Sequence, residues 1–385
     1  MTFKVLSVFG TRPEAIKMAP VVQALTADPR FESRVCVTAQ HRQMLDSVLR
    51  LFKIQTDRDL DLMQPNQDVA ALTARILLGM REVLREERPD IVLVHGDTTT
   101  CFASALAAFN ERIPVGHVEA GLRTWNMSAP FPEEANRTLV SRIASLHYAP
   151  TSRARENLRA EGIDGNRIEV TGNTVIDALL AVRAKVQSAD SARWEQHFGR
   201  ELFTRLVIST RRSILVTGHR RENFGRGFVE LCSAIRDMAR AHDEWDFVYP
   251  VHLNPNVQAP VFGILGSEHN VHLISPQDYE PFVWLMDRSD VILTDSGGIQ
   301  EEAPALGKPV LVMREATERP EALDAGTVRL VGTSKESIAH GLTELLTDPS
   351  AYCRMANARN PYGDGSAARR IVEHLAKTIC RRPGR

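Results

Sequence analysis

The chain has 385 residues, of which 43% are hydrophobic and 25% are charged, and its formal net charge is -1. This length is too great for one small core and favours two domains of roughly 180 residues each. The near-neutral charge gives no support for a nucleic acid or a membrane surface as a partner. Any anionic ligand would be held by local basic groups and backbone dipoles instead of a global positive field.

The five cysteines are scattered and form no CxxC pair. This pattern argues against a disulfide framework or a zinc knuckle and predicts reduced thiols. The N-terminal sequence MTFKVLSVFG enters an apolar strand pattern directly, without the basic region and long apolar segment of an export signal. No apolar run approaches the length that spans a bilayer. We therefore expect a cytoplasmic protein.

Short apolar runs alternate with longer segments of helical period in the first half of the chain. The predicted strands are Val5 to Phe9, Arg34 to Thr38, Ile91 to Val94 and Pro114 to Val118. Repeated alternation of strand and helix predicts a parallel sheet covered by helices on both faces. The segment after Asn173 is helical and then polar, without a strand signal, which indicates a passage between two domains.

The same pattern begins again in the second half. The predicted strands are Ser213 to Thr217, Asp246 to Tyr249, Val271 to Leu273, Asp290 to Leu293 and Pro309 to Val312. The fold class is therefore α/β, with two doubly wound Rossmann-like domains facing a central cleft as the default ligand site. The segment from Gly365 to Ile379 predicts a terminal helix, and its pattern leaves open which domain it packs on.

The first motif, FGTRPEAIK, follows the first predicted strand. Gly10 lies at the turn, Arg12 follows in the turn, Pro13 lies at a first helical position, and Lys17 comes one helical turn later. Unpaired N–H groups at a helix N-terminus, with two nearby cations, suit a phosphate. The motif is not the dinucleotide fingerprint, which needs GxGxxG. An ordinary turn with solvated charges is the alternative.

Two later strands end in the similar segments His95-Gly96-Asp97 and His117-Val118-Glu119. Both acidic residues fall at carboxyl ends of strands, where parallel sheets bind their ligands. Asp97 could alternatively be the N-cap of the helix that starts near Thr98. Histidine with carboxylate also permits zinc or manganese, but no HExxH or similar cluster accompanies the pairs, so no metal site is predicted.

The segment FPEEANRTL places Glu133, Glu134 and Arg137 at the start of a helix. Acidic residues in a first helical turn complement the helix dipole, and Glu133 with Arg137 has the spacing of an ordinary i, i+4 pair. Only one of the two glutamates needs a chemical role.

The second half carries a basic loop, LVTGHRRENFGRGF, with His219, Arg220 and Arg221 after a strand. This loop could bind phosphates, or it could be a solvated basic loop. The later segment ISPQDYEPFVWLM contains Gln277 and Phe282, an amide and an aromatic ring that could bind a flat base. Core packing of Phe282 is an equally good interpretation.

The segment TDSGGIQEE combines a possible phosphate site with two carboxylates. We interpret it as two half-sites: the N–H groups of Ser296, Gly297 and Gly298 would meet a diphosphate, and Glu302 would accept hydrogen bonds from ribose hydroxyls. Glu301 is expected to be a solvated or structural charge. The next segment, REATERPEAL, adds Arg314, Glu318 and Arg319.

These segments together resemble the non-hydrolysing UDP-N-acetylglucosamine 2-epimerases. The similarity extends over nearly the whole chain through FGTRPEAIKMAP, HGDTTT, HVEAGLRT, PFPEEANRTL, TGHRRENFG, TDSGGIQEEAPALGKPVLVMR, TERPEAL and NPYGDG. The resemblance implies conversion of UDP-GlcNAc to UDP-ManNAc without a metal or nicotinamide cofactor, on a glycosyltransferase-B-like architecture. It also implies a cytoplasmic homodimer that supplies ManNAc units for envelope polysaccharide.

The resemblance further implies a set of site residues. Catalytic roles fall on Asp97, Glu119, Glu133 and His219. Substrate binding falls on Arg12, Lys17, Gln277, Phe282, Ser296, Gly297, Gly298, Glu302 and Arg319. The implied N-terminal domain comprises residues 1–172 and a returning C-terminal helix, 364–385, and the nucleotide-binding domain comprises residues 173–363.

The chain departs from the family pattern at two places. Where many members have DTTERP, this chain has Glu315 and Ala316 before Thr317 and Glu318. In members that a second UDP-GlcNAc activates, a region matching Gln40 to Gln43 and a downstream arginine take part. Asn66 occupies that arginine's place here, which puts direct activation by substrate in doubt.

Three other functions are compatible with the same motifs. A hydrolysing epimerase would release UDP and free ManNAc, a glycosyltransferase of the same fold would need a separate acceptor, and a regulator would bind nucleotide sugar without turnover. Asp97, Glu119 and Glu133 are all present, which argues against the regulator.

Overall fold

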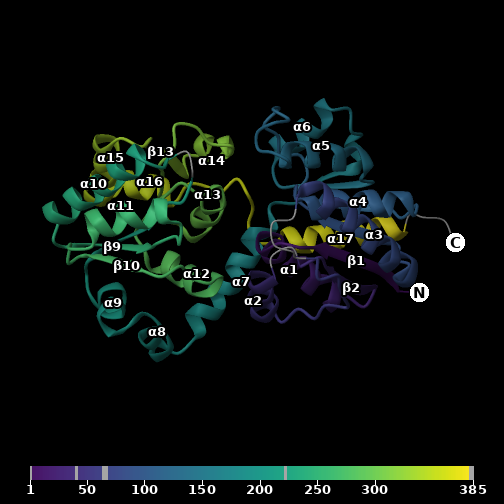
Figure 1. Ribbon diagram of the computed structural model, residues 1–385, viewed down its shortest axis with the longest axis horizontal. Helices are drawn as coiled ribbons and strands as arrows, with labels where there is room; N and C mark the ends of the chain where they lie inside the picture. The colour runs from purple at the N-terminus through teal and green to yellow at the C-terminus, as the bar shows by residue number, and fades with distance from the viewer. Residues whose placement is uncertain (1, 40–41, 63–67, 221–222, 381–385) are drawn as a thin grey trace. The chain divides into compact units, whose positions relative to one another are not determined.

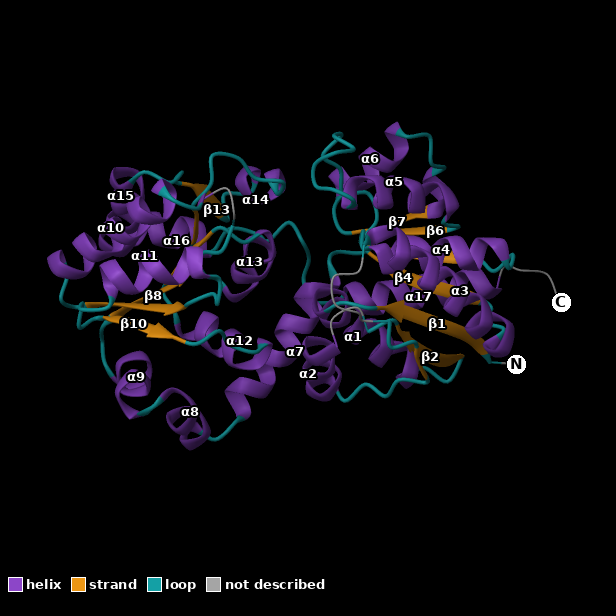
Figure 2. Cartoon of the chain, in the orientation of Figure 1, coloured by secondary structure: helices purple, strands orange, loops and turns teal. Residues whose placement is uncertain are grey.

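The computed structural model describes residues 2–39, 42–62, 68–220 and 223–380. Contacts divide the chain into two compact units: unit 1 is Met1–Ala178 with Tyr362–Arg385, and unit 2 is Leu179–Pro361. Each unit contains one parallel β-sheet flanked by helices (Figure 2). The predicted α/β class, with two Rossmann-like units each built on a parallel sheet, is therefore confirmed. The domain limits predicted above remain a prediction, which limited proteolysis would test.

The sheet of unit 1 is seven-stranded and parallel, with the order β3-β2-β1-β4-β5-β6-β7. Its strands are β1 (Phe3–Phe9), β2 (Phe31–Val37), β3 (Arg58–Asp59), β4 (Ile91–His95), β5 (Val115–Val118), β6 (Leu146–Ala149) and β7 (Ile168–Val170). The order reverses between β1 and β4, so the loops after these two strands diverge at the carboxyl edge of the sheet. Such a switch point is where open α/β sheets bind ligands.

The helices of unit 1 pack in two groups, α1 with α2 and α17, and α3 with α4 and α5. Right-handed crossovers place these groups on opposite faces of the sheet, because the chain winds in opposite directions from the switch point. The helices are α1 (Arg12–Ala27), α2 (Arg42–Phe52), α3 (Val69–Glu87), α4 (Thr99–Asn110), α5 (Glu133–Ile143), α6 (Ser152–Ala160) and α17 (Ala367–Cys380). The helix α7 (Thr174–Ser188) continues from unit 1 into unit 2.

The sheet of unit 2 is six-stranded and parallel, with the order β10-β9-β8-β11-β12-β13. Its strands are β8 (Arg212–Thr217), β9 (Trp245–Pro250), β10 (Val271–Ile274), β11 (Val291–Thr294), β12 (Val310–Val312) and β13 (Val328–Leu330). Here the order reverses between β8 and β11, so the segments after these strands, which carry His219 and Asp295, lie at the second switch point.

Helices also flank the sheet of unit 2, as Figure 1 shows. They are α8 (Ser191–Phe198), α9 (Arg200–Phe203), α10 (Arg226–Ala241), α11 (Pro255–Leu265), α12 (Tyr279–Arg288), α13 (Gly297–Glu302), α14 (Pro320–Asp324), α15 (Lys335–Thr347) and α16 (Pro349–Ala356). No helix in the described part of the chain has both the length and the apolar character needed to cross a bilayer.

Local sequence explains why the central strand β4 forms and why β1 ends at Gly10. All five residues of β4, Ile-Val-Leu-Val-His, are buried, as expected for a strand covered on both faces. At the end of β1, a Cβ on Gly10 would lie 2.0 Å from Oγ1 of Thr38 and 2.5 Å from Oγ1 of Thr100. Only glycine therefore allows the chain to leave β1 between these two hydroxyls and enter α1.

The terminal helix α17 belongs to unit 1 and packs against α1 (Figure 1). Its N-terminal N–H groups are satisfied by Asp177 of α7, whose carboxylate accepts hydrogen bonds from Ala367 N at 3.1 Å and Ala368 N at 2.9 Å. Arg370 donates to the carbonyl oxygen of Thr171 at 3.0 Å. A carboxylate from a distant part of the sequence thus caps the last helix.

Replacing Asp177 by alanine would leave the first N–H groups of α17 without their acceptor. We expect a loss of about 1–2 kcal/mol in the free energy of helix docking, the usual cost of removing a cap. Amide hydrogen exchange at Ala368 measures this directly, and Asp177→Asn, which keeps an acceptor oxygen, is the matched control. Equal exchange at Ala368 in the wild type and Asp177→Ala would contradict the capping role.

Candidate active site

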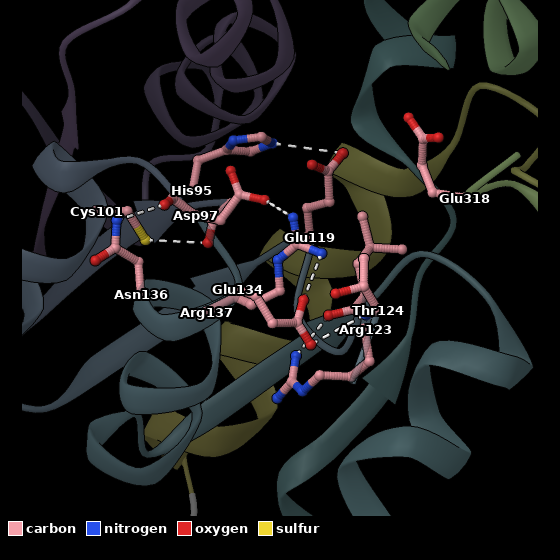
Figure 3. Close-up of polar contacts among 12 residues, drawn as sticks. His95, Asp97, Cys101, Glu119, Arg123, Thr124, Glu134, Asn136, Arg137 and Glu318 are labelled. Carbon is pink, nitrogen blue, oxygen red and sulfur yellow. Dashed lines mark hydrogen bonds and ion pairs between the residues drawn. The ribbon is translucent and has the colours of Figure 1, made fainter. Parts of the chain in front are cut away.

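Glu119 lies at the carboxyl end of β5, at the centre of a buried polar cluster in unit 1 (Figure 3). Its carboxylate accepts hydrogen bonds from Nζ of Lys17 at 2.5 Å and from Nδ2 of Asn173 at 2.8 Å. The backbone of Glu119 has φ = 61°, a left-handed conformation that is unusual for a non-glycine residue and often marks a functional position. Three separate segments, after β1, β5 and β7, therefore converge on one carboxylate.

His95 lies close to this carboxylate, with Nε2 3.9 Å from Oε2 of Glu119. Burial lowers the pKa of His95 to about 3, although the charge of Glu119 acts in the opposite direction. Its two ring nitrogens have no hydrogen-bond partner among the described residues. The imidazole is therefore neutral at physiological pH, and Glu119 obtains its positive counter-charge from Lys17.

Asp97 follows β4 and pairs with a cation from α5. Its Oδ2 accepts a hydrogen bond from Nη2 of Arg137, and its backbone carbonyl accepts one from Nδ2 of Asn136 at 2.9 Å. The alternative that Asp97 is the N-cap of the following helix is wrong: the N-cap of α4 is Thr98, whose hydroxyl accepts from Cys101 N at 3.1 Å. The carboxylate of Asp97 is thus not used in capping.

The two glutamates at the start of α5 have different surroundings. Glu134 is 1% exposed and pairs with Arg137 at 3.1 Å, and it accepts hydrogen bonds from the backbone N–H groups of Thr124 and Trp125. The interpretation of Glu133 with Arg137 as an i, i+4 pair is therefore wrong, because the guanidinium binds Glu134 and Asp97. Oε2 of Glu133 is buried without a hydrogen-bond partner among the described residues, which leaves it available for a ligand.

The N-terminus of α1 differs from the predicted phosphate site. Thr11 and Glu14 form a capping box, in which the Glu14 carboxylate accepts from Thr11 N at 2.8 Å and Gly10 N at 3.0 Å. Burial raises the pKa of Glu14, although hydrogen bonds from Thr98, Gly10 and Thr11 oppose this change. Internal capping therefore occupies the N–H groups of Gly10, Thr11 and Glu14, and phosphate binding by the rest of this segment, with Arg12, stays a prediction.

The metal interpretation of the two histidine and carboxylate pairs receives no support. His117 binds the Gly96 carbonyl through Nε2 at 2.7 Å, and burial lowers the pKa of His117 to about 4. No group of three or more His, Cys, Asp or Glu side chains in the described part of the chain has the arrangement of a metal site.

In unit 2, His219 lies beside a buried aspartate that sequence reasoning did not single out. Oδ2 of Asp295 accepts hydrogen bonds from His219 N at 2.9 Å, Arg220 N at 2.8 Å and Nδ2 of Asn223 at 3.2 Å. Burial lowers the pKa of His219, and the nearby Asp295 charge opposes this change. Asp295 thus ties the loop after β8 to the end of β11. Arg221 lies outside the described residues, as do Gln40 and Asn66.

Most of the remaining charges in this part of unit 2 are paired. Glu318 binds Nη2 of Arg220 at 3.0 Å and Nη1 of Arg314 at 2.5 Å. Burial alone would raise the pKa of Glu318, but backbone hydrogen bonding and the positive charges of Arg319 and Arg314 lower it to about 2. Arg319 binds Glu301, which is 1% exposed. Glu301 is therefore a buried, structural ion-pair partner and not a solvated charge.

The segment of the two glycines begins α13. Ser296 is its N-cap and makes no side-chain cap hydrogen bond within the described residues, and the amides of Gly297 and Gly298 follow. A Cβ on Gly297 would lie 2.9 Å from Oε1 of Glu318, so glycine leaves room for the present position of the Glu318 and Arg220 pair. One turn later, Glu302 accepts a hydrogen bond from the Tyr279 hydroxyl at 2.6 Å.

The two residues considered for binding a base lie at the start of α12. Phe282 is half-buried and is not among the fully buried core residues. Gln277 donates a hydrogen bond to the Ser275 carbonyl at 2.7 Å, and its Oε1 contacts Nε2 of His197 in α8 at 2.8 Å. The assignment of all these residues to a substrate site stays a prediction. The sequence analysis did not identify three further polar residues that the structure brings into these clusters. They are Asn173, in the segment TGNT, Tyr279, in the segment QDY, and Asp295, in the segment TDSGG.

The two parallel sheets, each with polar residues at its switch point, define an α/β protein with two Rossmann-like units. A family model described as UDP-N-acetylglucosamine 2-epimerase matches residues 23–376. The UDP-N-acetylglucosamine 2-epimerase of Escherichia coli (strain K12) is 60% identical over 372 residues, which cover 97% of this chain and 98% of that protein. The chain therefore belongs to the UDP-N-acetylglucosamine 2-epimerase family.

Solved structures agree with this assignment. The crystal structure of the Neisseria meningitidis UDP-GlcNAc 2-epimerase bound to UDP-GlcNAc matches with a TM-score of 0.88 at 52% identity, covering 97% of this chain and 100% of that chain. The Methanocaldococcus jannaschii UDP-GlcNAc 2-epimerase in complex with UDP-GlcNAc and UDP matches with a TM-score of 0.79 at 31% identity, with the same coverage.

The buried histidines of unit 1 predict a loss of stability in acid. Burial lowers the pKa of His95 to about 3, of His117 to about 4 and of His147 to about 3. In the unfolded chain a histidine has a pKa of about 6.5, so below that pH the unfolded state binds protons that the folded state does not. The free energy of unfolding should therefore fall as pH decreases from about 6.5 towards 4.

Urea unfolding of the wild type and of His147→Phe measures this effect. Removing the imidazole of His147 should reduce the slope of the unfolding free energy against pH by up to about 1.4 kcal/mol per pH unit between pH 6 and 4.5. Above pH 7.5, where the imidazole is neutral in both states, the difference between the two proteins should not depend on pH. Identical slopes in acid would contradict the assignment.

Proposed function

We propose that this chain catalyses the reversible C2 epimerisation of UDP-N-acetylglucosamine to UDP-N-acetylmannosamine without net hydrolysis. The main support is the arrangement of two carboxylates, Asp97 and Glu119, at the carboxyl ends of the adjacent strands β4 and β5, each held by a cation. Relatives whose structures contain UDP-GlcNAc or UDP share the fold over nearly the whole chain.

The chemistry requires an indirect route. The C2 proton of a GlcNAc ring is not adjacent to a carbonyl, so its direct removal is implausible at the basicity of ordinary side chains. We propose that the C1–O bond breaks and UDP leaves with the electron pair. The C2 proton passes to a base, and a C1=C2 double bond forms to give 2-acetamidoglucal. UDP then adds to C1 while a proton is delivered to the opposite face of C2. Atoms and electrons balance, so no redox cofactor is needed.

Asp97, Glu119 and Glu133 are the proposed proton-handling groups, because two faces of C2 must be served. The contacts support different properties for these groups. Lys17 and Asn173 hold Glu119, and Arg137 holds Asp97, whereas one oxygen of Glu133 is buried without a hydrogen-bond partner among the described residues. Carboxylates with unlike surroundings suit separate acid and base roles.

The leaving diphosphate needs stabilisation of its developing charge, and preorganised donors of this kind often contribute more to catalysis than any other single effect. We propose that Arg12, His219 and the amides of Ser296, Gly297 and Gly298 provide it. Burial lowers the pKa of His219, which favours the neutral imidazole in the free protein. A bound diphosphate beside it, together with Asp295, would raise that pKa and favour the imidazolium.

The other predicted contacts concern the nucleotide. Glu302 would accept hydrogen bonds from the ribose hydroxyls, and Gln277 and Phe282 would bind the base. Arg319, which pairs with Glu301, would line the same nucleotide-sugar site. Lys17 acts through Glu119 in this proposal, since its ammonium group pairs with that carboxylate. We also propose that the protein is a cytoplasmic homodimer that supplies ManNAc units for envelope polysaccharide.

Proton NMR of the purified protein with UDP-GlcNAc in D2O, without added NAD or metal, tests the function. We expect UDP-ManNAc with deuterium at C2, because the proton delivered to C2 comes from a side chain that exchanges with solvent. Formation of UDP and free ManNAc would select the hydrolysing reaction instead. An unchanged spectrum would favour a glycosyltransferase or a binding protein.

The three carboxylates are tested separately by Asp97→Asn, Glu119→Gln and Glu133→Gln. We expect kcat to fall by about 100-fold or more in the variants that remove a general acid or base. Glu156→Gln, a change of the same type in the exposed part of α6, is the control and should keep normal turnover. Near-normal turnover in all three variants would contradict the proposed roles.

A further inference from the structure

Arg137 of α5 contacts two carboxylates, one on each side of its guanidinium group (Figure 3). Nη2 donates to Oδ2 of Asp97, and Nη1 donates to Oε2 of Glu134 at 3.1 Å. The side chain of Arg137 is 12% exposed and that of Glu134 is 1% exposed. A guanidinium that is largely out of water and shared by two carboxylates has little freedom to rotate, because each carboxylate fixes one of its nitrogens.

Glu134 fixes this arrangement to the backbone. Its second oxygen, Oε1, accepts hydrogen bonds from Thr124 N at 3.0 Å and Trp125 N at 2.9 Å. Both N–H groups belong to the loop between β5 and α5, and Trp125 has φ = 64°, so the backbone there adopts an unusual conformation. The carboxylate of Glu134 therefore joins three parts of unit 1: the loop, α5 and, through Arg137, Asp97.

Asp97 is held twice by the same turn of α5. Arg137 binds its side chain, and Asn136 binds its backbone carbonyl at 2.9 Å. Asp97 itself follows Gly96, which has φ = 65°, in the turn between β4 and α4. Because Arg137 holds one oxygen, the rotation of the Asp97 carboxylate is restricted. Such orientation affects the rate of a proton transfer more than it affects binding.

We propose that Arg137 is a positioning residue, which orients Asp97 for proton transfer at C2 and is itself oriented by Glu134. This inference rests on the proposed function, since it concerns the step in which Asp97 takes part. Lysine cannot fully replace Arg137, because one ammonium group lacks the planar fork that reaches both carboxylates at fixed angles. The relay also links Asp97 to the loop that contains Thr124 and Trp125.

Steady-state kinetics of Arg137→Met, Arg137→Lys and Glu134→Gln test the proposal. We expect kcat to fall by about 100-fold in Arg137→Met, as for other misplaced catalytic groups, with KM changed by less than about threefold. Arg137→Lys should recover part of the loss, and Glu134→Gln should show a smaller loss of the same kind. Arg142→Met, an exposed arginine of the same helix, is the matched control and should behave as the wild type.

A double-mutant cycle with Asp97→Asn separates positioning from a general structural role. If Arg137 acts through Asp97, the double variant Asp97→Asn/Arg137→Met should be no slower than Asp97→Asn alone. Losses that multiply in the double variant, or a normal kcat in Arg137→Met, would overturn the proposal.

Two further outcomes keep the proposal testable. If Arg137→Met does not fold, as circular dichroism would show, the cycle is carried out with Glu134→Gln, which retains the guanidinium. If the wild type itself forms no deuterated UDP-ManNAc in D2O, the proposed function fails, and that failure is recognised before any variant is compared.

Discussion

The parallel pairing of β1 with β4 is the constraint on which the candidate site of unit 1 depends. Val5 to Val8 pair with Ile91 to Val94, and the strand order reverses at this pair. The segments that follow β1 and β4 therefore leave the sheet in opposite directions, and their first residues remain at one edge. Lys17, Asp97 and Glu119 come from different parts of the sequence, and they share this edge only because the three strands are parallel and in register.

Charge compensation then decides how these residues are arranged. A buried carboxylate without a counter-charge is costly, and the chain supplies a cation or backbone donors for most of them. Glu119 has Lys17 and Asp97 has Arg137. In unit 2, Asp295 accepts two backbone N–H groups. The exception among the predicted catalytic residues is one oxygen of Glu133, buried without a hydrogen-bond partner in the described part of the chain. Such an oxygen is suited to meeting a substrate.

Apolar runs predicted the central strands of both sheets correctly, because strands covered on both faces consist almost entirely of buried hydrophobic residues. The strands β3, β6, β7 and β13, which have two to four residues, were not predicted, whereas the four-residue edge strand β10 was. Contacts from distant segments were also not predictable. One such contact is the binding of Asp97 by Arg137, forty residues away. The capping box of Thr11 and Glu14, in contrast, has a local T-x-x-E spacing and was missed, although it occupies amides that suggested a phosphate site.

Sequence patterns predicted the fold class, the positions of the polar segments at strand ends and, through the long motifs, the family. These features can be predicted because hydrophobic periodicity and turn residues direct the backbone over only a few neighbouring positions. The charge pairs, in contrast, could be identified only in the folded chain: Lys17 with Glu119, Arg137 with Asp97, and Arg319 with Glu301. Pairing of this kind depends on distances through space and on burial, and neither quantity follows from spacing along the chain.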